Sequence, residues 1–110
     1  MKLGVFSALK HSSPKEWAEK HRKLGLSVVN FPLSYQEDTA RIEAYATEAK
    51  KNQLIIAEVG VWRNTMALDN ETRQAAIKYA IGQLELADKI GARCCVNIMG
   101  ARGVRWDGAY

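Results

Sequence analysis

Strand-like apolar runs alternate with helix-like segments along this chain, and the alternation limits the folds open to it more than any other feature. The strand-like runs lie at about 3–7, 26–31, 54–61 and 93–99, and a helix-like segment follows each of the first three. Strands that alternate with helices form parallel sheets joined by crossover connections. The order therefore predicts an α/β domain with about four parallel strands and three helices.

Local signals predict where the first helix begins and ends. Ser13 is a typical N-cap, Pro14 suits the first helical position, and Glu16 completes a capping box. Gly25 stands where a helix commonly ends, because glycine adopts the left-handed conformation without strain. The first helix is therefore expected between these signals.

Apolar spacing predicts the two other helices. The second is expected to bury one stripe of side chains: Ile42, Tyr45, Ala46 and Ala49. The third, from about 70 to 90, is expected to begin at an Asn70 cap and to end at Gly91. Its predicted core-facing stripe is Ile77, Ala80, Ile81, Leu84 and Ala87.

Composition excludes several classes of protein. At 110 residues the chain is expected to form one domain, without a second. No apolar run approaches the roughly 18–20 residues that span a bilayer, and the first residues lack the pattern of a signal peptide. The net charge of +4 is spread along the chain, whereas nucleic-acid binders usually concentrate it. We therefore expect a cytoplasmic protein that binds neither membranes nor nucleic acid.

The two cysteines are adjacent, Cys94 and Cys95, within the last strand-like run. Neighbouring side chains of a strand point to opposite faces, so the pair is poorly placed to share a metal or to form an unstrained disulfide. We therefore expect two small buried apolar residues in a reducing compartment.

Two architectures fit the alternation. One is part of a (β/α)₈ TIM barrel, of which this chain would supply about half, because such barrels need some 200 residues or more. The other is a small open doubly wound parallel sheet. No glycine-rich phosphate loop follows the first strand-like run, which argues against a dinucleotide-binding fold.

Polar residues lie at or near the carboxyl ends of the predicted strands, where both architectures place their active sites. Asn30 and Asn97 lie near the ends of the second and fourth runs, and Glu58 interrupts the apolar third run. Glu58 is expected to alternate with Ile56, Gly60 and Trp62 on one face. Burying an unpaired carboxylate is costly, so Glu58 is expected to face a ligand or a basic partner.

Three stretches of the chain resemble one protein family. The residues Lys2 to Ser7, Trp17 to Asn30 and Gln83 to Ala92 are similar to the first, second and fourth strands of the xylose-isomerase-like TIM barrels and the helices beside them. These are sugar phosphate isomerases and epimerases. The resemblance extends over residues 1–110 and implies the N-terminal half of such a barrel.

The resemblance also implies an activity. Family members move a proton next to a carbonyl, beside a divalent metal such as Mn²⁺, Mg²⁺ or Zn²⁺, in a small-molecule sugar or sugar phosphate. Their metal ligands come from later strands, so no catalytic or metal-binding residue is carried onto this chain. The isolated 110-residue chain is therefore expected to be inactive and to bind no metal.

The resemblance does imply a substrate-binding surface, formed by residues at the strand ends and in the loops that follow them. Its candidates are Glu58, Asn97, Asn30, Trp62 and Arg102, and His11 is added because it lies in the first βα loop, on the same expected face. Each also has a structural explanation: an ion pair for Glu58, a strand-bridging amide for Asn97, a turn-bracing amide for Asn30, packing for Trp62, exposure to solvent for His11 and a flexible tail for Arg102.

A second hypothesis remains beside the enzyme. The chain would then be a self-contained α/β module that binds a ligand or partner without catalysis. If the strands instead form part of a barrel, unpaired strand edges and exposed apolar surface predict that the chain associates with itself.

Overall fold

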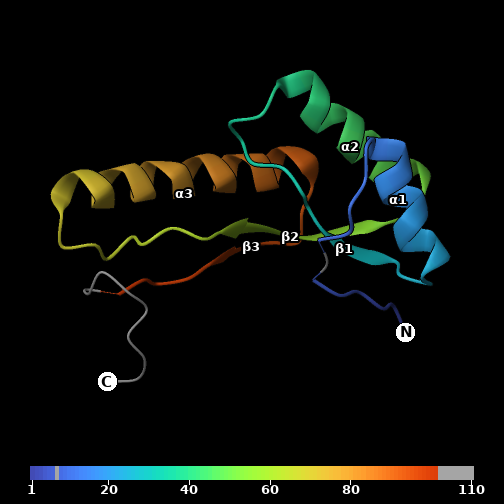
Figure 1. The fold of residues 1–110 in the computed structure, drawn as a ribbon, viewed down its shortest axis with the longest axis horizontal. Helices are drawn as coiled ribbons and strands as arrows, with labels where there is room; N and C mark the ends of the chain where they lie inside the picture. Colours follow the sequence, from blue (N-terminus) through green and yellow to red (C-terminus); the bar gives the residue numbers. More distant parts are fainter. Residues whose placement is uncertain (7, 102–110) are drawn as a thin grey trace.

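The computed structural model of the protein describes residues 1–6 and 8–101, within which three helices alternate with three strands (Figure 1). The elements are α1 Pro14–Lys23, β1 Val28–Asn30, α2 Thr39–Lys51, β2 Ile55–Val61, α3 Asn70–Ile90 and β3 Cys94–Asn97. The predicted α/β class is confirmed. Among the described helices, none has both the length and the apolar content needed to cross a membrane.

The three strands form one parallel sheet in the order β1-β2-β3. The strand predicted at 3–7 is wrong, because the described part of this segment makes only an isolated bridge between Gly4 and Val28. The carbonyl of Leu3 accepts hydrogen bonds from the backbone N–H groups of Ser27 and Val28, at 2.9 and 3.1 Å. The N-terminal segment thus lies beside β1 without extending into a strand.

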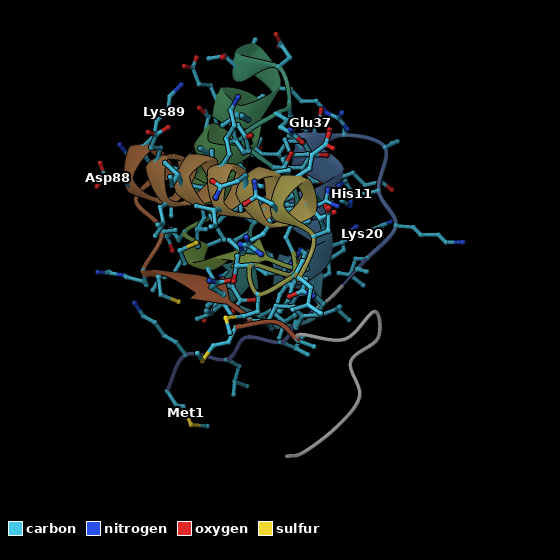
Figure 2. All side chains as sticks on the ribbon, turned by 90° about the vertical axis from the view of Figure 1, so that its left-hand side faces the viewer. Met1, His11, Lys20, Glu37, Asp88 and Lys89 are labelled. Atoms are coloured by element: carbon cyan, nitrogen blue, oxygen red, sulfur yellow. The ribbon has the colours of Figure 1, made fainter. Side chains whose placement is uncertain are left out.

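The three helices pack together with the sheet around one apolar core. Figure 1 places the N-terminal segment beyond the sheet from α3, and Figure 2 shows Met1 on that side in a view turned by 90°. The buried residues of the core come from all three helices and from β1, β2 and their flanks: Trp17, Ala18, Val29, Phe31, Ile42, Tyr45, Ala49, Leu54, Ile56, Val59, Leu86 and Ala87. The stripe predicted for the second helix is confirmed at Ile42, Tyr45 and Ala49.

A bulge in β2 changes which side chains face the helices. Val29 pairs with Ile56 and Asn30 pairs with Glu58, so Ala57 is an extra residue in β2. A bulge reverses the alternation of side chains beyond it. The prediction that Ile56 and Glu58 share one face of the strand is therefore wrong. Ile56 is buried in the core, while Glu58 lies on the opposite face of β2.

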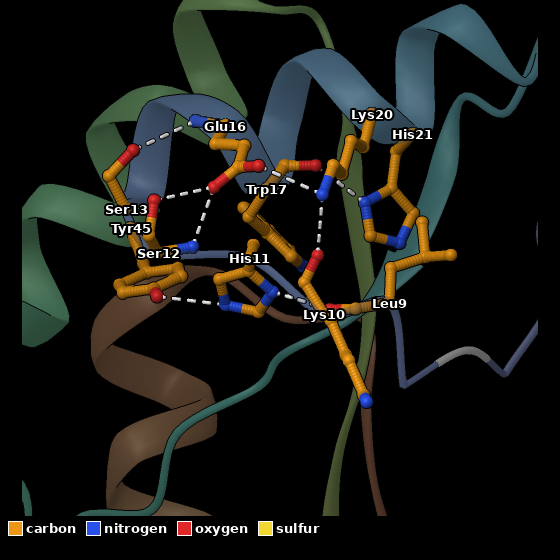
Figure 3. Close-up of polar contacts among 10 residues, drawn as sticks. All are labelled: Leu9, Lys10, His11, Ser12, Ser13, Glu16, Trp17, Lys20, His21 and Tyr45. Atoms are coloured by element: carbon orange, nitrogen blue, oxygen red, sulfur yellow. Dashed lines mark hydrogen bonds and ion pairs between the residues drawn. The ribbon is translucent and has the colours of Figure 1, made fainter.

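The predicted capping signals of α1 are confirmed, with one shift in detail. The Ser13 hydroxyl accepts a hydrogen bond from the backbone N–H of Glu16, at 3.2 Å. The Glu16 carboxylate accepts from the backbone N–H and hydroxyl of Ser12, both at 2.6 Å, and pairs with Lys20 at 2.8 Å (Figure 3). Gly25 follows the helix with a positive φ of 73°. The helix start is thus held by polar contacts.

The structure corrects the predicted cap and the predicted core face of α3. Asp69 is the N-cap, accepting from the backbone N–H of Thr72 at 2.7 Å, although Gly91 ends the helix as predicted. Ala87 is buried, but Ile77, Ile81 and Leu84 are exposed. The residues buried on α3 are mostly small: Ala76, Gly82, Gln83, Leu86 and Ala87. Small side chains let α3 lie close to the sheet. A prediction that places the bulkiest apolar residues toward the core therefore chooses the wrong face of the helix.

The cysteines also differ from the prediction. Cys94 is exposed, whereas Cys95 is half-buried, and both are free thiols. The two residues pair with Glu58 and Val59 of β2, so their side chains lie on opposite faces of β3. Burial raises the pKa of the Cys95 thiol, and the neighbouring Cys94 adds to this effect. Only Cys95 packs against the core as expected.

The contacts of Glu16 predict a stability that depends on pH. Hydrogen bonds from Lys20 and Ser12 lower the pKa of Glu16 from 4.5 to about 2. A folded-state pKa below the unfolded one stabilises the fold fully above the unfolded pKa, and this contribution is lost as the pH falls toward the folded pKa. We expect Glu16→Gln to lower the melting temperature most at neutral pH and hardly at all near pH 2.

Thermal unfolding followed by circular dichroism measures this difference. Glu19→Gln is the matched control, because Glu19 is exposed on α1 and its carboxylate lies 3.9 Å from Lys15. A difference between the wild type and Glu16→Gln that stays constant from neutral pH to pH 2 would contradict the assignment.

Candidate functional site

Four of the six predicted site residues line one pocket at the carboxyl ends of β1 and β2. This strand-end pocket has a volume of about 370 Å³. Its walls come from the N-terminal segment, the start of α1, β1, β2 and the residues after each strand: Phe6, Ala8, Leu9, His11, Trp17, Asn30, Phe31, Pro32, Glu58, Gly60 and Trp62. The structure thus brings together His11, Asn30, Glu58 and Trp62.

Asn30 and Glu58 supply the polar part of the pocket from two neighbouring strands. They are partners in the parallel register, and both are half-buried. The backbone carbonyl of Glu58 accepts a hydrogen bond from the N–H of Phe31, at 2.9 Å, so the strands are joined where the two side chains lie. An amide and a carboxylate side by side can accept and donate hydrogen bonds to a hydroxylated ligand.

Trp62 supplies an apolar wall, and its position depends on Gly60. The indole ring lies across Gly60 so closely that a Cβ there would be 2.5 Å from the indole nitrogen. Phe6 packs edge-on against the indole, with ring centroids 6.1 Å apart. Trp62 is nevertheless 53% exposed. A large aromatic surface therefore stays open beside the polar groups of the pocket.

His11 is held in place by two hydrogen bonds, and it is half-buried, contrary to its predicted exposure. Its Nδ1 lies 2.6 Å from the carbonyl of Leu9, and its Nε2 lies 2.9 Å from the hydroxyl of Tyr45 (Figure 3). A carbonyl only accepts, so Nδ1 carries a proton and donates it to Leu9. Both ring nitrogens are engaged, and His11 acts as a fixed part of the wall.

The other two predicted site residues are not part of the pocket. Asn97 is exposed at the end of β3, where it pairs with Val61 of β2, and it does not line the strand-end pocket. Arg102 lies outside the described residues.

Asn64 fixes the loop that carries Trp62, a role that the sequence analysis did not foresee. Its side-chain amide donates to the carbonyl of Ala101 at 2.7 Å and accepts from the N–H of Ala101 at 3.0 Å. Thr65 adds a hydrogen bond from its hydroxyl to the carbonyl of Met99, at 2.9 Å. These contacts tie the loop after β2 to the segment after β3.

Gln83 of α3 is a second positioning residue that sequence reasoning missed. Its side chain is 3% exposed. Its Oε1 accepts from the backbone N–H of Tyr35 at 2.8 Å, and its Nε2 donates to the carbonyl of Gly60 at 2.9 Å. One amide thus links α3, the loop after β1 and the strand beneath Trp62. The sequence did contain a signal for this role, because Gln83 is a polar residue on the helical face that also carries Ala76 and Ala87.

The described residues do not fit a metal centre. Within them, no group of three or more His, Cys, Asp and Glu side chains lies close enough to hold an ion. The pocket offers one carboxylate, one amide and an aromatic face, which are binding groups with no metal-ligand cluster beside them.

Comparison with known proteins does not identify a family. No family model matches the chain, and neither the curated proteins nor the solved structures include a significant match.

The contacts of Gln83 predict a large cost for its removal. Gln83→Ala would leave the N–H of Tyr35 and the carbonyl of Gly60 without their partners, and a buried polar group left unpaired costs about 1–3 kcal/mol. We expect Gln83→Ala to lower the free energy of unfolding by about 2 kcal/mol or more. Urea denaturation measures this change.

The matched control is Gln74→Ala, an exposed position on the same helix. It makes the same change in helix propensity and removes no buried hydrogen bond. Equal stability of the two variants would show that the Gln83 bridge contributes nothing to the fold.

Proposed function

We propose that the strand-end pocket is the carbohydrate-binding wall of a protein that handles a sugar or sugar phosphate. The observation that carries the proposal is the convergence of Asn30, Glu58 and Trp62 from separate segments of the chain on one pocket. Sugars have apolar C–H faces and a rim of hydroxyl groups. A pocket that combines an aromatic surface with a few fixed polar groups suits both.

The arrangement of the strands supports the proposal that the strand-end pocket belongs to a (β/α)₈ barrel. The N-terminal segment, β1, β2 and β3 lie side by side in chain order, and the helices share a core on one side of the sheet. An arc of a barrel has this sequential order, whereas a doubly wound sheet reverses its strand order at a switch point. The opposite face, with Glu58 and Gly60, would then line the barrel interior.

The reaction remains an expectation from the family resemblance. Proton transfer next to a carbonyl, as in metal-dependent sugar isomerases and epimerases, is assigned to no residue of this chain. The described residues provide no metal-binding cluster, so we derive no step through a metal. What these residues do is bind and orient: Glu58 and Asn30 hydrogen-bond hydroxyl groups, and Trp62 holds the apolar face of the ring.

A non-catalytic binding module is the alternative. The observation that favours it is that, among the residues that the structure describes, those lining the strand-end pocket all lie between positions 6 and 62. Such a module would bind its ligand with no further segment. Turnover of ketoses by the 110-residue chain in the presence of Mn²⁺ or Mg²⁺ would contradict both this alternative and the expectation that the isolated chain is inactive.

Binding measurements on pocket variants test the proposal. Isothermal titration calorimetry with a panel of ketoses and ketose phosphates is expected to detect binding to the wild type. Glu58→Gln weakens a hydrogen bond to a charged acceptor, and Trp62→Ala removes the aromatic face, so each is expected to lower the affinity about tenfold.

Two control variants carry similar changes outside the pocket. Glu19→Gln removes an exposed carboxylate of α1, and Leu68→Ala shortens an exposed apolar side chain in the loop that carries Trp62. Both are expected to bind like the wild type. Equal affinity of all four variants, or no binding of any sugar in the panel, would refute the assignment of the pocket.

A further inference from the structure

An exposed apolar stripe runs along α3. Ile77, Ile81 and Leu84 are 37%, 52% and 56% exposed, although all three belong to the stripe predicted to face the core. Their spacing of four and then three residues is the spacing of a coiled-coil seam. We call these three residues the α3 seam.

The α3 seam lies on the side of the helix away from the sheet. The buried face of α3 is formed by other positions: Ala76, Gly82, Gln83, Leu86 and Ala87. Figure 2, turned by 90° from Figure 1, shows the sheet on one side of α3. The helix therefore has two apolar stripes, of which the protein's own core covers one.

Charges on one flank of the seam are complementary. Lys78 follows Ile77 and Glu85 follows Leu84, so both occupy the same coiled-coil position, seven residues apart. Seven residues rise about 10 Å along a helix, too far for Lys78 and Glu85 to pair within one helix. Within the described residues, neither side chain makes an ion pair.

We propose that the α3 seam binds the same seam of a second copy of this chain, with the two helices antiparallel. An antiparallel pair brings equivalent flanks together, so Lys78 of each copy meets Glu85 of the other copy. The midpoint between positions 78 and 85 falls next to Ile81, inside the seam. A single two-fold axis at this point therefore brings both the apolar seams and the charged pairs together.

The other flank of the seam disfavours the parallel arrangement. It carries Ala80 and Ala87, which have no charge. In a parallel pair, each flank meets the opposite flank of its partner, so Lys78 and Glu85 would meet a flank that offers only Ala80, because Ala87 is buried in the core of its own chain. The flanking charges thus select both the partner and the orientation.

Polar Gln74 and Asp88 occupy the next seam positions, so the contact is short and the dimer dissociates on dilution.

The dimer is independent of the proposed sugar binding. No residue of the α3 seam lines the strand-end pocket, so pairing leaves that pocket open. Loss of sugar binding and loss of the dimer are therefore separate outcomes.

Sedimentation equilibrium of the 110-residue chain over a range of concentrations tests the dimer. The wild type is expected to rise from monomer to dimer mass. Ile81→Glu is expected to keep the chain monomeric, whereas Leu68→Glu, at an exposed apolar site outside α3, is expected to associate like the wild type. Circular dichroism checks that each variant keeps its helices.

A charge swap tests the orientation. Lys78→Glu alone and Glu85→Lys alone place like charges together and are each expected to weaken the dimer about tenfold. The double variant Lys78→Glu with Glu85→Lys restores the pairing and is expected to regain the wild-type affinity. A wild type that stays monomeric, an Ile81→Glu variant that associates like Leu68→Glu, or a double variant no tighter than the singles would each overturn the proposal.

Discussion

The structure depends on β2, whose two faces make different kinds of contact. On one face, Leu54, Ile56, Val59 and Val61 are buried, and the first three belong to the core shared with the helices. Regular alternation would not place positions 54, 56, 59 and 61 on one face, and the extra residue Ala57 makes it possible. The same bulge turns Glu58 and Gly60 to the opposite face. One local irregularity therefore builds the core and aims the polar residue of the pocket.

Polar side chains outside the binding surface hold the pocket in shape. Gln83 fixes the strand at Gly60, Asn64 fixes the loop after β2, and Tyr45 orients His11. A site whose groups are locked by such contacts loses little conformational entropy when a ligand binds. These bonds join elements that are distant in sequence, because Gln83 reaches Gly60 across 23 positions and His11 reaches Tyr45 across 34. The pocket is thus a product of the tertiary fold.

Features encoded locally could be predicted from the sequence, and features that depend on packing could not. Ser13, Pro14 and Gly91 act within one helical turn, so the helix ends were predicted almost to the residue. The strand at 3–7 failed because an edge segment needs a long-range partner register, and the structure provides only the bridge at Gly4. The predicted core face of α3 was wrong because close packing selected small residues over Ile77, Ile81 and Leu84.

Part of the candidate site could also be predicted. Asn30 and Glu58 were predicted because strand ends follow the sequence directly, whereas Gln83 and Asn64 act through contacts that no local pattern encodes.

The central claim is that the face of β2 opposite the core, with Asn30 beside it, binds a sugar. Amide chemical-shift mapping by NMR spectroscopy during titration with a ketose phosphate tests it most directly. The account predicts shifts that cluster at Asn30, Glu58, Gly60 and the Trp62 indole, and that leave the hollow between α2 and α3 around Lys50 and Arg93 unchanged. Shifts confined to that second hollow, or no shifts at saturating sugar, would contradict it.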